Sequence, residues 1–473
     1  MTIDTLPNDV LLGIFDSYVE DMDVEEWIML AHVCRHWRSV VFQSSCCLNL
    51  RLHCIPGTPV RDTLDIWPPL PLSIHDAIFE DEPSQPGLDN IIAALEHNDR
   101  VCQIQFESFS SSQLEYLVTN STIMQKPFPE LTEPVLSVDK HDRDGPIIPD
   151  SFLDGTAPRL RSLKLAIPFP GLPKLLLSAT HLVNLELHDI PISGYIPPEE
   201  MATSLSALTI LESLWLDIRW PVLASRRPPP SPLTRSILPS LTKLIFKGVS
   251  EYLEEFLTQA DAPQLNDLHI TFFNEIIFDT PQLFRFISQR PNLRVLEKGQ
   301  IVFNYAAIKV KFPSQTFDYG VLSVVIPCIA QESQLSFLKQ VCTSSLPPIS
   351  TLVDLSIFED KYSELRWQDD DENILPLWLE LLHPFAAVKN LYVCKKFVPR
   401  IAPVLQELVG GRTTEVLPTL ENIFLEGFQP PSGPLHEGIK PFLAARRLTG
   451  QPVAVSRWDR DLEQEMHSEI YDP

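Results

Sequence analysis

The sequence predicts an α/β protein in which a small N-terminal three-helix module precedes a long, curved parallel sheet with helices and loops on its convex side. Two observations favour this fold class. Apolar residues recur at helical spacing through the first fifty residues, and a short apolar triplet then recurs through most of the remaining chain. The two patterns divide the chain into a helical module and a repeat array.

The composition restricts the partners that the protein can have. Its 473 residues include 37 basic and 62 acidic side chains, which give a net charge of −25. This charge disfavours nucleic acid and anionic membrane surfaces as partners, because both would be repelled. No apolar run approaches the about 20 residues of a membrane span, and the first residues lack the pattern of a secretory signal. The 8 cysteines form no Cys-x-x-Cys pair. We therefore expect a cytoplasmic or nuclear protein with reduced thiols.

The first residues carry the most specific pattern. Leu6-Pro7 precedes Asn8-Asp9, as at a helix start, and apolar residues then follow at positions 10, 11, 14, 15 and 18. A second helical pattern runs from 24 to 34, and a third contains Trp37. Helices this short offer more apolar surface than they can bury among themselves. We expect the excess to be covered by a partner or by the rest of the chain.

These helices resemble a known family. The matching residues are Leu6-Pro7-x-x-Val10-Leu11-x-x-Ile14-Phe15 and Leu30-x-x-Val33-Cys34-Arg35-x-Trp37-Arg38. They resemble the F-box, a module that docks on the Skp adaptor of a cullin ubiquitin ligase. The family usually has a Leu-Trp pair shortly after position 42, where this chain has Ser44-Ser45-Cys46-Cys47-Leu48. The resemblance implies adaptor contacts by Leu6, Pro7, Val10, Leu11, Ile14, Phe15, Leu30, Val33, Cys34 and Trp37. Taken singly, each of these residues also fits a place in the chain's own core.

Beyond residue 60 a Leu-x-x-Leu-x-Leu unit recurs, as in Pro158-x-Leu160-x-x-Leu163-x-Leu165. Its copies, some of them degenerate, begin at 101, 131, 160, 182, 211, 241, 265, 293, 321, 352, 388 and 420, so neighbours lie 22 to 36 residues apart. This triplet and period indicate leucine-rich repeats. Each strand turns alternate leucines towards one core, and stacked neighbours bury what one unit cannot. The asparagine that commonly follows the triplet is absent, so we expect an irregular solenoid with varied returns.

The patterns predict four regions: an F-box domain at 1–50, a linker and N-terminal cap at 51–99, degenerate repeats at 100–430, and a C-terminal cap and tail at 431–473. Helical returns are expected at 252–258, 281–288, 372–382 and 403–408, an exposed loop at 220–239, and a tail helix and strand at 442–447 and 453–458. The combination resembles fungal, basidiomycete-type F-box proteins with degenerate leucine-rich repeats. Typical of that group are Leu48-x-Leu50-x-Leu52, Asp62-Thr63-Leu64-Asp65-x-Trp67-Pro68 and the copy at Leu417-Pro418.

Catalytic motifs are not found. The sequence contains no G-x-S-x-G, Walker A or G-x-G-x-x-G. His32 and His36 lie four apart on an expected helix, as two metal ligands can, but a surface or packed pair is the preferred interpretation. Cys46-Cys47 is interpreted as two ordinary thiols, and the acidic run at 369–372 as a solvated helix start. We predict no enzymatic activity, no cofactor and no metal.

The remaining function is binding. Residues that flank the leucines of a triplet point to the concave face, and aromatic residues there are candidate anchors for a protein target. The flanking residues are Lys164, Glu186, His188, Trp215, Asp217, His269, Phe358, Tyr392, Phe424 and Glu426, of which Trp215, Tyr392 and Phe424 are the candidate target-binding residues. The predicted function is a substrate adaptor of an SCF-type cullin ligase. The alternatives are a leucine-rich-repeat scaffold whose helical module only caps the solenoid, and a hydrolase with a serine or cysteine within hydrogen-bond reach of a histidine.

Overall fold

The computed structural model divides the chain into two compact units, Met1–Trp220 and Pro221–Pro473, which are described separately. The structure describes residues 6–20, 26–43, 50–57, 59–66, 69–76, 87–120, 122–138, 146–218, 235–273, 280–294, 296–313, 320–328, 331–342, 346, 349–360, 374–407, 416–427 and 434–460. The predicted features at 44–49 and 369–372, and residues 220–234 of the loop expected at 220–239, lie outside these residues.

The first unit begins with three helices that pack on one another. They are α1 (Asn8–Glu20), α2 (Glu26–Val33) and α3 (Arg35–Gln43). Their positions agree with the helical patterns read from the sequence. Leu11 and Phe15 on α1 are buried, as are Val40 and Val41 on α3, so the three helices enclose a small core.

The remainder of this unit is a parallel sheet whose strands are neighbours in the order of the sequence. The strands are β1 (Leu50–His53), β2 (Leu72–His75), β3 (Val101–Phe109), β4 (Glu133–Val138), β5 (Ser162–Leu165), β6 (Asn184–Ile190) and β7 (Ser213–Ile218). Leu163, Leu185 and Leu214 stand opposite one another across β5, β6 and β7, and all three are buried. The same triplet position therefore lies in the same layer of the core in each strand.

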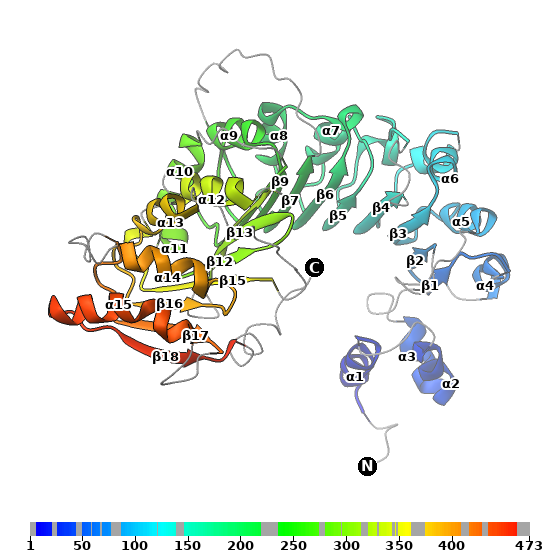
Figure 1. Cartoon of the computed structure of the whole chain (residues 1–473). Helices are drawn as coiled ribbons and strands as arrows, with labels where there is room; N and C mark the ends of the chain where they lie inside the picture. Colours follow the sequence, from blue (N-terminus) through cyan, green and yellow to red (C-terminus); the bar gives the residue numbers. More distant parts are fainter. Residues whose placement is uncertain are drawn as a thin grey trace. The chain divides into compact units, whose positions relative to one another are not determined.

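Short helices connect these strands, and Figure 1 shows them along one side of the sheet. They are α4 (Val60–Ile66), α5 (Leu88–Leu95), α6 (Ser111–Glu115), η2 (Tyr116–Asn120), η3 (Ile123–Gln125), η4 (Phe152–Gly155), α7 (Leu172–Leu176), η5 (Ile192–Gly194) and α8 (Pro198–Leu205). Gly194, in the connection after β6, lies close to Pro168, in the connection after β5. A Cβ atom on residue 194 would lie only 2.8 Å from the Cα of Pro168.

The second unit contains a larger, mostly parallel sheet with the strand order β9-β11-β14-β13-β12-β15-β16-β17-β18. Its strands are β9 (Lys243–Gly248), β11 (Asp267–Phe272), β12 (Lys298–Phe303), β13 (Ala307–Phe312), β14 (Leu322–Pro327), β15 (Asp354–Glu359), β16 (Asn390–Val393), β17 (Asn422–Glu426) and β18 (Ala454–Trp458). β8 (Ser236–Ile237) and β10 (Ala260–Asp261) form a separate two-stranded pair.

The helices of the second unit are α9 (Ser250–Gln259), α10 (Pro281–Ser288), α11 (Pro291–Arg294), α12 (Gln331–Gln340), η7 (Ile349–Thr351), α13 (Ile374–Leu382), α14 (Val398–Glu407) and α15 (Pro434–Leu448). Helices had been predicted near α9, α10, α13, α14 and α15. The predicted starts at 403 and 442 were wrong, because α14 and α15 begin earlier and carry Pro403 and Pro441 inside them. A proline-containing stretch was thus interpreted as a helix boundary where the helix continues.

The prediction of a consecutively parallel sheet was wrong between 298 and 327. β13 runs antiparallel between β14 and β12, so β14, not β12, pairs with β11. The connection from β12 to β13 is too short for a parallel crossover and must form a hairpin. Asn304 shapes it, because its side-chain oxygen accepts the Ala306 N–H at 3.1 Å. The triplet pattern had no copy over β13, and the copy begun at Leu293 starts in α11 instead of a strand.

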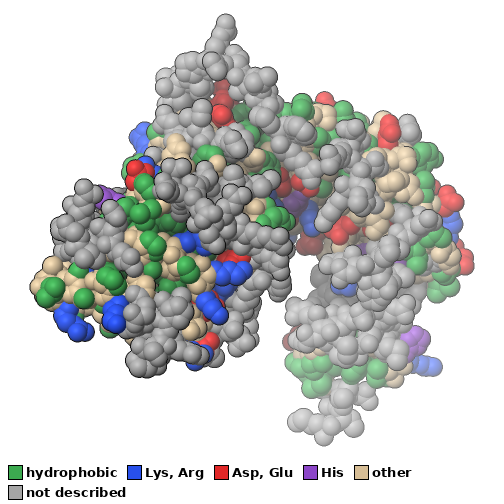
Figure 2. Space-filling model, viewed as in Figure 1, with side chains coloured by type: hydrophobic (Ala, Val, Ile, Leu, Met, Phe, Trp, Pro, Cys, Tyr) green, Lys and Arg blue, Asp and Glu red, His purple; other side chains and the backbone are tan. Residues whose placement is uncertain are grey.

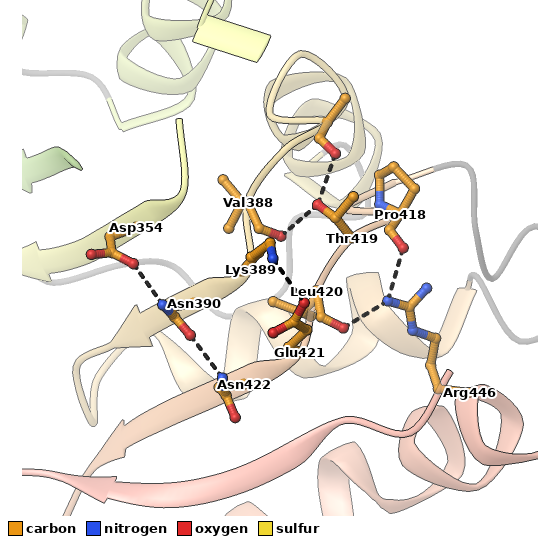
Figure 3. A network of polar contacts seen from close by, with 11 residues as sticks. Asp354, Val388, Lys389, Asn390, Pro418, Thr419, Leu420, Glu421, Asn422 and Arg446 are labelled. Atoms are coloured by element: carbon orange, nitrogen blue, oxygen red, sulfur yellow. Dashed lines mark hydrogen bonds and ion pairs between the residues drawn. The ribbon is translucent and has the colours of Figure 1, made fainter. Parts of the chain in front are cut away.

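Buried arginines hold the segments that connect the strands in place. Arg446 on α15 is fully buried, and its Nη2 donates to the carbonyl oxygens of Leu417, Pro418 and Leu420 at 3.0 to 3.3 Å. Figure 3 shows the contacts with Pro418 and Leu420. Arg290 likewise donates from Nε to the carbonyl of Ala262 at 2.8 Å. Each guanidinium satisfies backbone carbonyls of the preceding return, which would otherwise lose their hydrogen bonds on burial.

Replacing Arg446 with methionine should therefore lower the free energy of unfolding by about 3 kcal/mol, because buried carbonyls lose their donor. Urea denaturation followed by tryptophan fluorescence measures the change. Arg447 is exposed on the same helix, so Arg447→Met is the matched control and should stay within about 0.5 kcal/mol of wild type. Equal losses in both variants would contradict this role for Arg446.

Candidate interaction surfaces

The apolar residues of α1 form two rows with different environments. Leu11 and Phe15, one turn apart, are fully buried. Val10 and Ile14, also one turn apart, are 45% and 47% exposed, and Pro7 before the helix is exposed on the same side. We call Pro7, Val10 and Ile14 the α1 apolar row. The helix thus has a wider apolar arc than the core of its own module covers.

The buried row belongs to the core of the three helices. The rings of Phe15 and Trp37 lie 4.8 Å apart between centroids, and Leu30 is buried with them. Leu6, Cys34 and Trp37 are half-buried. Of the residues predicted to contact an adaptor, Leu11, Phe15 and Leu30 therefore lie inside the module, whereas Pro7, Val10, Ile14 and Val33 lie on its surface.

The break between α2 and α3 explains the Val33-Cys34-Arg35-x-Trp37-Arg38 motif locally. The Cys34 sulfur accepts the Trp37 N–H at 3.4 Å, which satisfies one of the free donors in the first turn of α3. Arg38 Nε donates to the Ala31 carbonyl at 2.9 Å and ties the two helices together. Val33 is left 58% exposed at the end of α2. The structural role of Arg38 had not been predicted, although its place in the motif was recognised.

The same break separates His32 from His36. Both were expected on one helix, but they lie on α2 and α3, with Cys34 between the helices. Among the described residues no group of three or more His, Cys, Asp or Glu side chains is arranged to hold a metal ion. Nor does the described part of the chain contain a helix whose length and hydropathy would let it cross a bilayer.

The face of the first sheet opposite the core carries polar ladders. Ser73, Gln103 and Glu133 come from β2, β3 and β4 and are joined by hydrogen bonds of 2.8 and 2.9 Å. Farther along, the His188 ring lies 4.4 Å from that of Trp215, and His188 Nε2 is 2.9 Å from Glu186. The candidate anchor Trp215 is therefore half-buried beside a histidine and a carboxylate.

Ser73 and His75 meet the distance criterion for a nucleophile and its base, since Ser73 Oγ and His75 Nε2 are 2.8 Å apart. The direction of the hydrogen bonds opposes that role. Gln103 donates through its amide nitrogen to Glu133, so its carbonyl accepts the one hydroxyl hydrogen of Ser73, and His75 must then donate to Ser73. Burial, with His53 and Arg51 nearby, lowers the pKa of His75 to about 4. Ser73 is fully buried. The pair is therefore a structural ladder.

Asp76 follows the same strand and is almost fully buried. Its Oδ2 accepts the N–H groups of Glu107 and Ser108 at 3.0 and 2.7 Å. Burial raises the pKa of Asp76 from 3.8 to about 6, although these hydrogen bonds oppose the shift. The buried carboxyl thus holds its proton at a pH where an unfolded chain has released it.

This raised pKa makes folding weaker as pH rises from about 4 to about 6, because the folded state must then ionise a buried carboxyl. Asp76→Asn should remove that loss, so the variant should gain on wild type by up to about 3 kcal/mol between pH 4 and pH 7. Urea denaturation at several pH values measures the gap. Asp62→Asn on the exposed surface of α4 controls for loss of a carboxylate. A gap for Asp76→Asn that does not grow with pH would refute the assignment.

The second sheet carries an aromatic cluster on the face opposite its core. Tyr392 and Phe424 stand in register on β16 and β17, and their rings stack at 4.5 Å with an interplanar angle of 9°. Trp458 on β18 lies 5.7 Å from Tyr392 and 6.3 Å from Phe358 on β15. The structure thus brings two of the three candidate anchors together, whereas Trp215 lies in the other unit.

Trp458 was missed as a member of this cluster, because the tail strand was not assigned to the repeat pattern. Tyr392 and Phe424 are half-buried, whereas Phe358 and Trp458 are buried. We call Phe358, Tyr392, Phe424 and Trp458 the aromatic cluster. Beside it, Asn390 donates to Asp354 and Asn422 donates to Asn390, at 2.7 and 2.8 Å, which fixes the register of these strands (Figure 3).

The space-filling view in Figure 2 shows several separate Lys and Arg side chains on the second unit, with Asp or Glu side chains beside some of them. Charges of both signs thus lie on this unit of a chain whose net charge is −25. The local charge of each face must therefore be considered separately from the net charge of the chain.

A family model described as F-box-like matches residues 3–46. No curated protein matches the chain. The match covers the three helices and the α1 apolar row, and the chain therefore carries an F-box-like domain at its N-terminus.

Proposed function

We propose that the protein is the substrate-recognition adaptor of an SCF-type cullin ubiquitin ligase. The F-box-like module binds the Skp adaptor, and the sheet-containing remainder binds a protein target. The observation that carries this proposal is the α1 apolar row, which an F-box-like module leaves exposed. The protein supplies proximity between target and ligase and performs no chemistry itself.

Burial of the α1 apolar row by a partner would contribute to the free energy of binding, because the three-helix module leaves this row exposed to solvent. Complete burial of a Val or Ile side chain is worth about 1.5 to 3 kcal/mol. Val10 and Ile14 are close to half exposed, so covering each should contribute about 1 kcal/mol, and Pro7 and Val33 extend the surface. Leu11 and Phe15 act indirectly, because they hold α1 in the position that presents this row.

The remainder is proposed to be a degenerate leucine-rich-repeat array with the C-terminal segment as its cap. In support, side chains join residues about one repeat apart: Ser73 with Gln103, Thr132 with Cys102, and Asn422 with Asn390 are separated by 30, 30 and 32 residues. Strand pairing brings corresponding triplet leucines into one layer. The hairpin of β12 and β13 is then an insertion into the array.

Replacing Ile14 with glutamate should weaken binding of the Skp adaptor at least tenfold, because a charge would enter the apolar contact. The matched control is Ile66→Glu, which places the same change on an exposed isoleucine of α4 outside the module. Calorimetric titration of the full chain with purified adaptor measures both. Thermal unfolding of each variant shows whether the fold is kept. The scaffold alternative requires that wild type and both variants fail to bind.

The aromatic cluster is the proposed contact with the target, with Trp215 as a further candidate in the other unit. A photo-crosslinking phenylalanine derivative at position 392 should crosslink to target proteins. The ubiquitination of these proteins should fall when the Ile14→Glu variant replaces the wild-type protein. The same derivative at position 66 is the control. Crosslinked proteins whose ubiquitination does not depend on Ile14 would count against target binding at Tyr392.

A further inference from the structure

The second sheet gathers basic residues on the face that carries the aromatic cluster. In β13 the core receives Ile308, Val310 and Phe312, so the alternation of the strand turns Lys309 and Lys311 to the opposite face. In β11 Leu268 and Ile270 are buried, and His269 lies between them on that same face. Lys243 and Lys247 of β9 alternate with Leu244 and Phe246 in the same way.

The strand register places these residues close together. His269 of β11 stands opposite Ser323 of β14, which stands opposite Lys311 of β13. In the next row of the same face, Val325 of β14 stands opposite Thr271 of β11 on one side and Lys309 of β13 on the other. Neighbouring strands lie about 4.8 Å apart, so the Cα atoms of His269 and Lys311 are about 10 Å apart. The side chain between them is the small Ser323, within reach of both neighbours.

Three lysines and one carboxylate act on His269. After burial, which is the largest cause, Lys243, Lys309 and Lys311 lower the pKa of His269 to about 4, and only Asp267 acts against them. Burial and then Lys309 lower the pKa of Lys311. Asp267 is occupied with the backbone, since its Oδ1 accepts the Val321 N–H at 2.8 Å.

No carboxylate shares the two rows that contain Lys309 and Lys311. Both rows cross β9, β11, β14, β13 and β12, in that order, and these strands are described in full. The row of Lys311 consists of Ile245, His269, Ser323, Lys311 and Gln300. The row of Lys309 consists of Lys247, Thr271, Val325, Lys309 and Val302. In a chain of net charge −25, two lysines and a histidine thus share a face without an acid in their own rows. We call His269, Lys309 and Lys311 the basic site.

The basic site and the aromatic cluster share one row of the sheet. Lys311 stands opposite Gln300, Gln300 opposite Ser356, Ser356 opposite Tyr392, and Tyr392 opposite Phe424. Three strand spacings separate Lys311 from Tyr392, or about 14 Å. An extended peptide rises about 3.3 Å per residue and covers that distance in about four residues. The row therefore has the length and chemistry for a short segment with charge at one end and an apolar group at the other.

We propose that this row binds an acidic segment of the protein target, whose carboxylates contact Lys309, Lys311 and His269 and whose apolar residue, about four positions away, packs on Tyr392 and Phe424. The inference rests on the proposed function only in assigning this face to the target. Charge complementarity selects the occupant: the lysines attract carboxylates, and the overall negative charge of the protein repels a long polyanion such as nucleic acid.

The test uses the full chain and a fluorescein-labelled peptide with four glutamates, a three-residue Gly-Ser-Gly spacer and a phenylalanine, which therefore lies four positions from the last glutamate. Fluorescence anisotropy measures its affinity. Lys309→Gln/Lys311→Gln should weaken binding at least tenfold, and so should glutamine in place of the peptide glutamates. The matched control removes two exposed lysines of the first unit, Lys126→Gln/Lys174→Gln, and should change the affinity less than twofold. Equal affinities for both double variants would overturn the proposal.

Three further measurements identify the occupant of this row. Ile14→Glu should leave peptide binding unchanged, so the acidic-segment proposal and the ligase proposal fail independently. Tighter binding of a ten-nucleotide oligothymidine than of the peptide would overturn the choice of a protein segment. Peptide binding that appears only after removal of 461–473, which contains Asp461, Glu463 and Glu465, would assign the row to the chain's own acidic residues. Thermal unfolding of both double variants checks that the fold is kept.

Discussion

Fixed register between neighbouring strands is the constraint on which both units depend. Leu163, Leu185 and Leu214 share one layer because their strands pair at corresponding positions. A slip of one residue would turn every such leucine to the other face. The opposite face resists that slip through side-chain ladders such as Asp354–Asn390–Asn422. Polar contacts on one face therefore hold the apolar layer on the other, and the buried arginines fix the returns that connect the strands.

The sequence could predict the elements better than their environments. Helical spacing located the three N-terminal helices, and the triplets located most strands, because both signals are local. The same spacing could not predict which apolar residues of α1 are buried and which are exposed. Val10 and Leu11 are adjacent apolar residues, yet one is half exposed and the other is buried. Which row faces the core depends on where α3 packs, and that is a tertiary property.

The hairpin of β12 and β13 shows where local patterns fail. A near-constant interval between triplets favoured one parallel strand per interval, and Leu293 and Leu296 are buried as that pattern requires. They lie before β12, however, and not within it. The sequence signal for the antiparallel strand was the alternation of Ile308, Val310 and Phe312, which has a period of two and no triplet. Sites built from separate elements, such as Tyr392, Phe424 and Trp458, could be suggested singly but not assembled.

The same hairpin brings two lysines to the second sheet. A strand taken from the repeat pattern would place leucines and their flanking residues at this position, whereas β13 contributes Lys309 and Lys311. At physiological ionic strength charges farther away than about 8 Å are largely screened, so the net charge of −25 acts weakly on a segment already in contact with the sheet. An extended polyanion, in contrast, would bring many of its charges within that distance of acidic side chains elsewhere on the protein, which repel it. Short acidic segments are therefore favoured over long ones, since their few charges can all lie within the range of the two lysines. Selectivity thus depends on which charges of the protein lie within the screening distance of the bound segment, and not on the net charge of the chain.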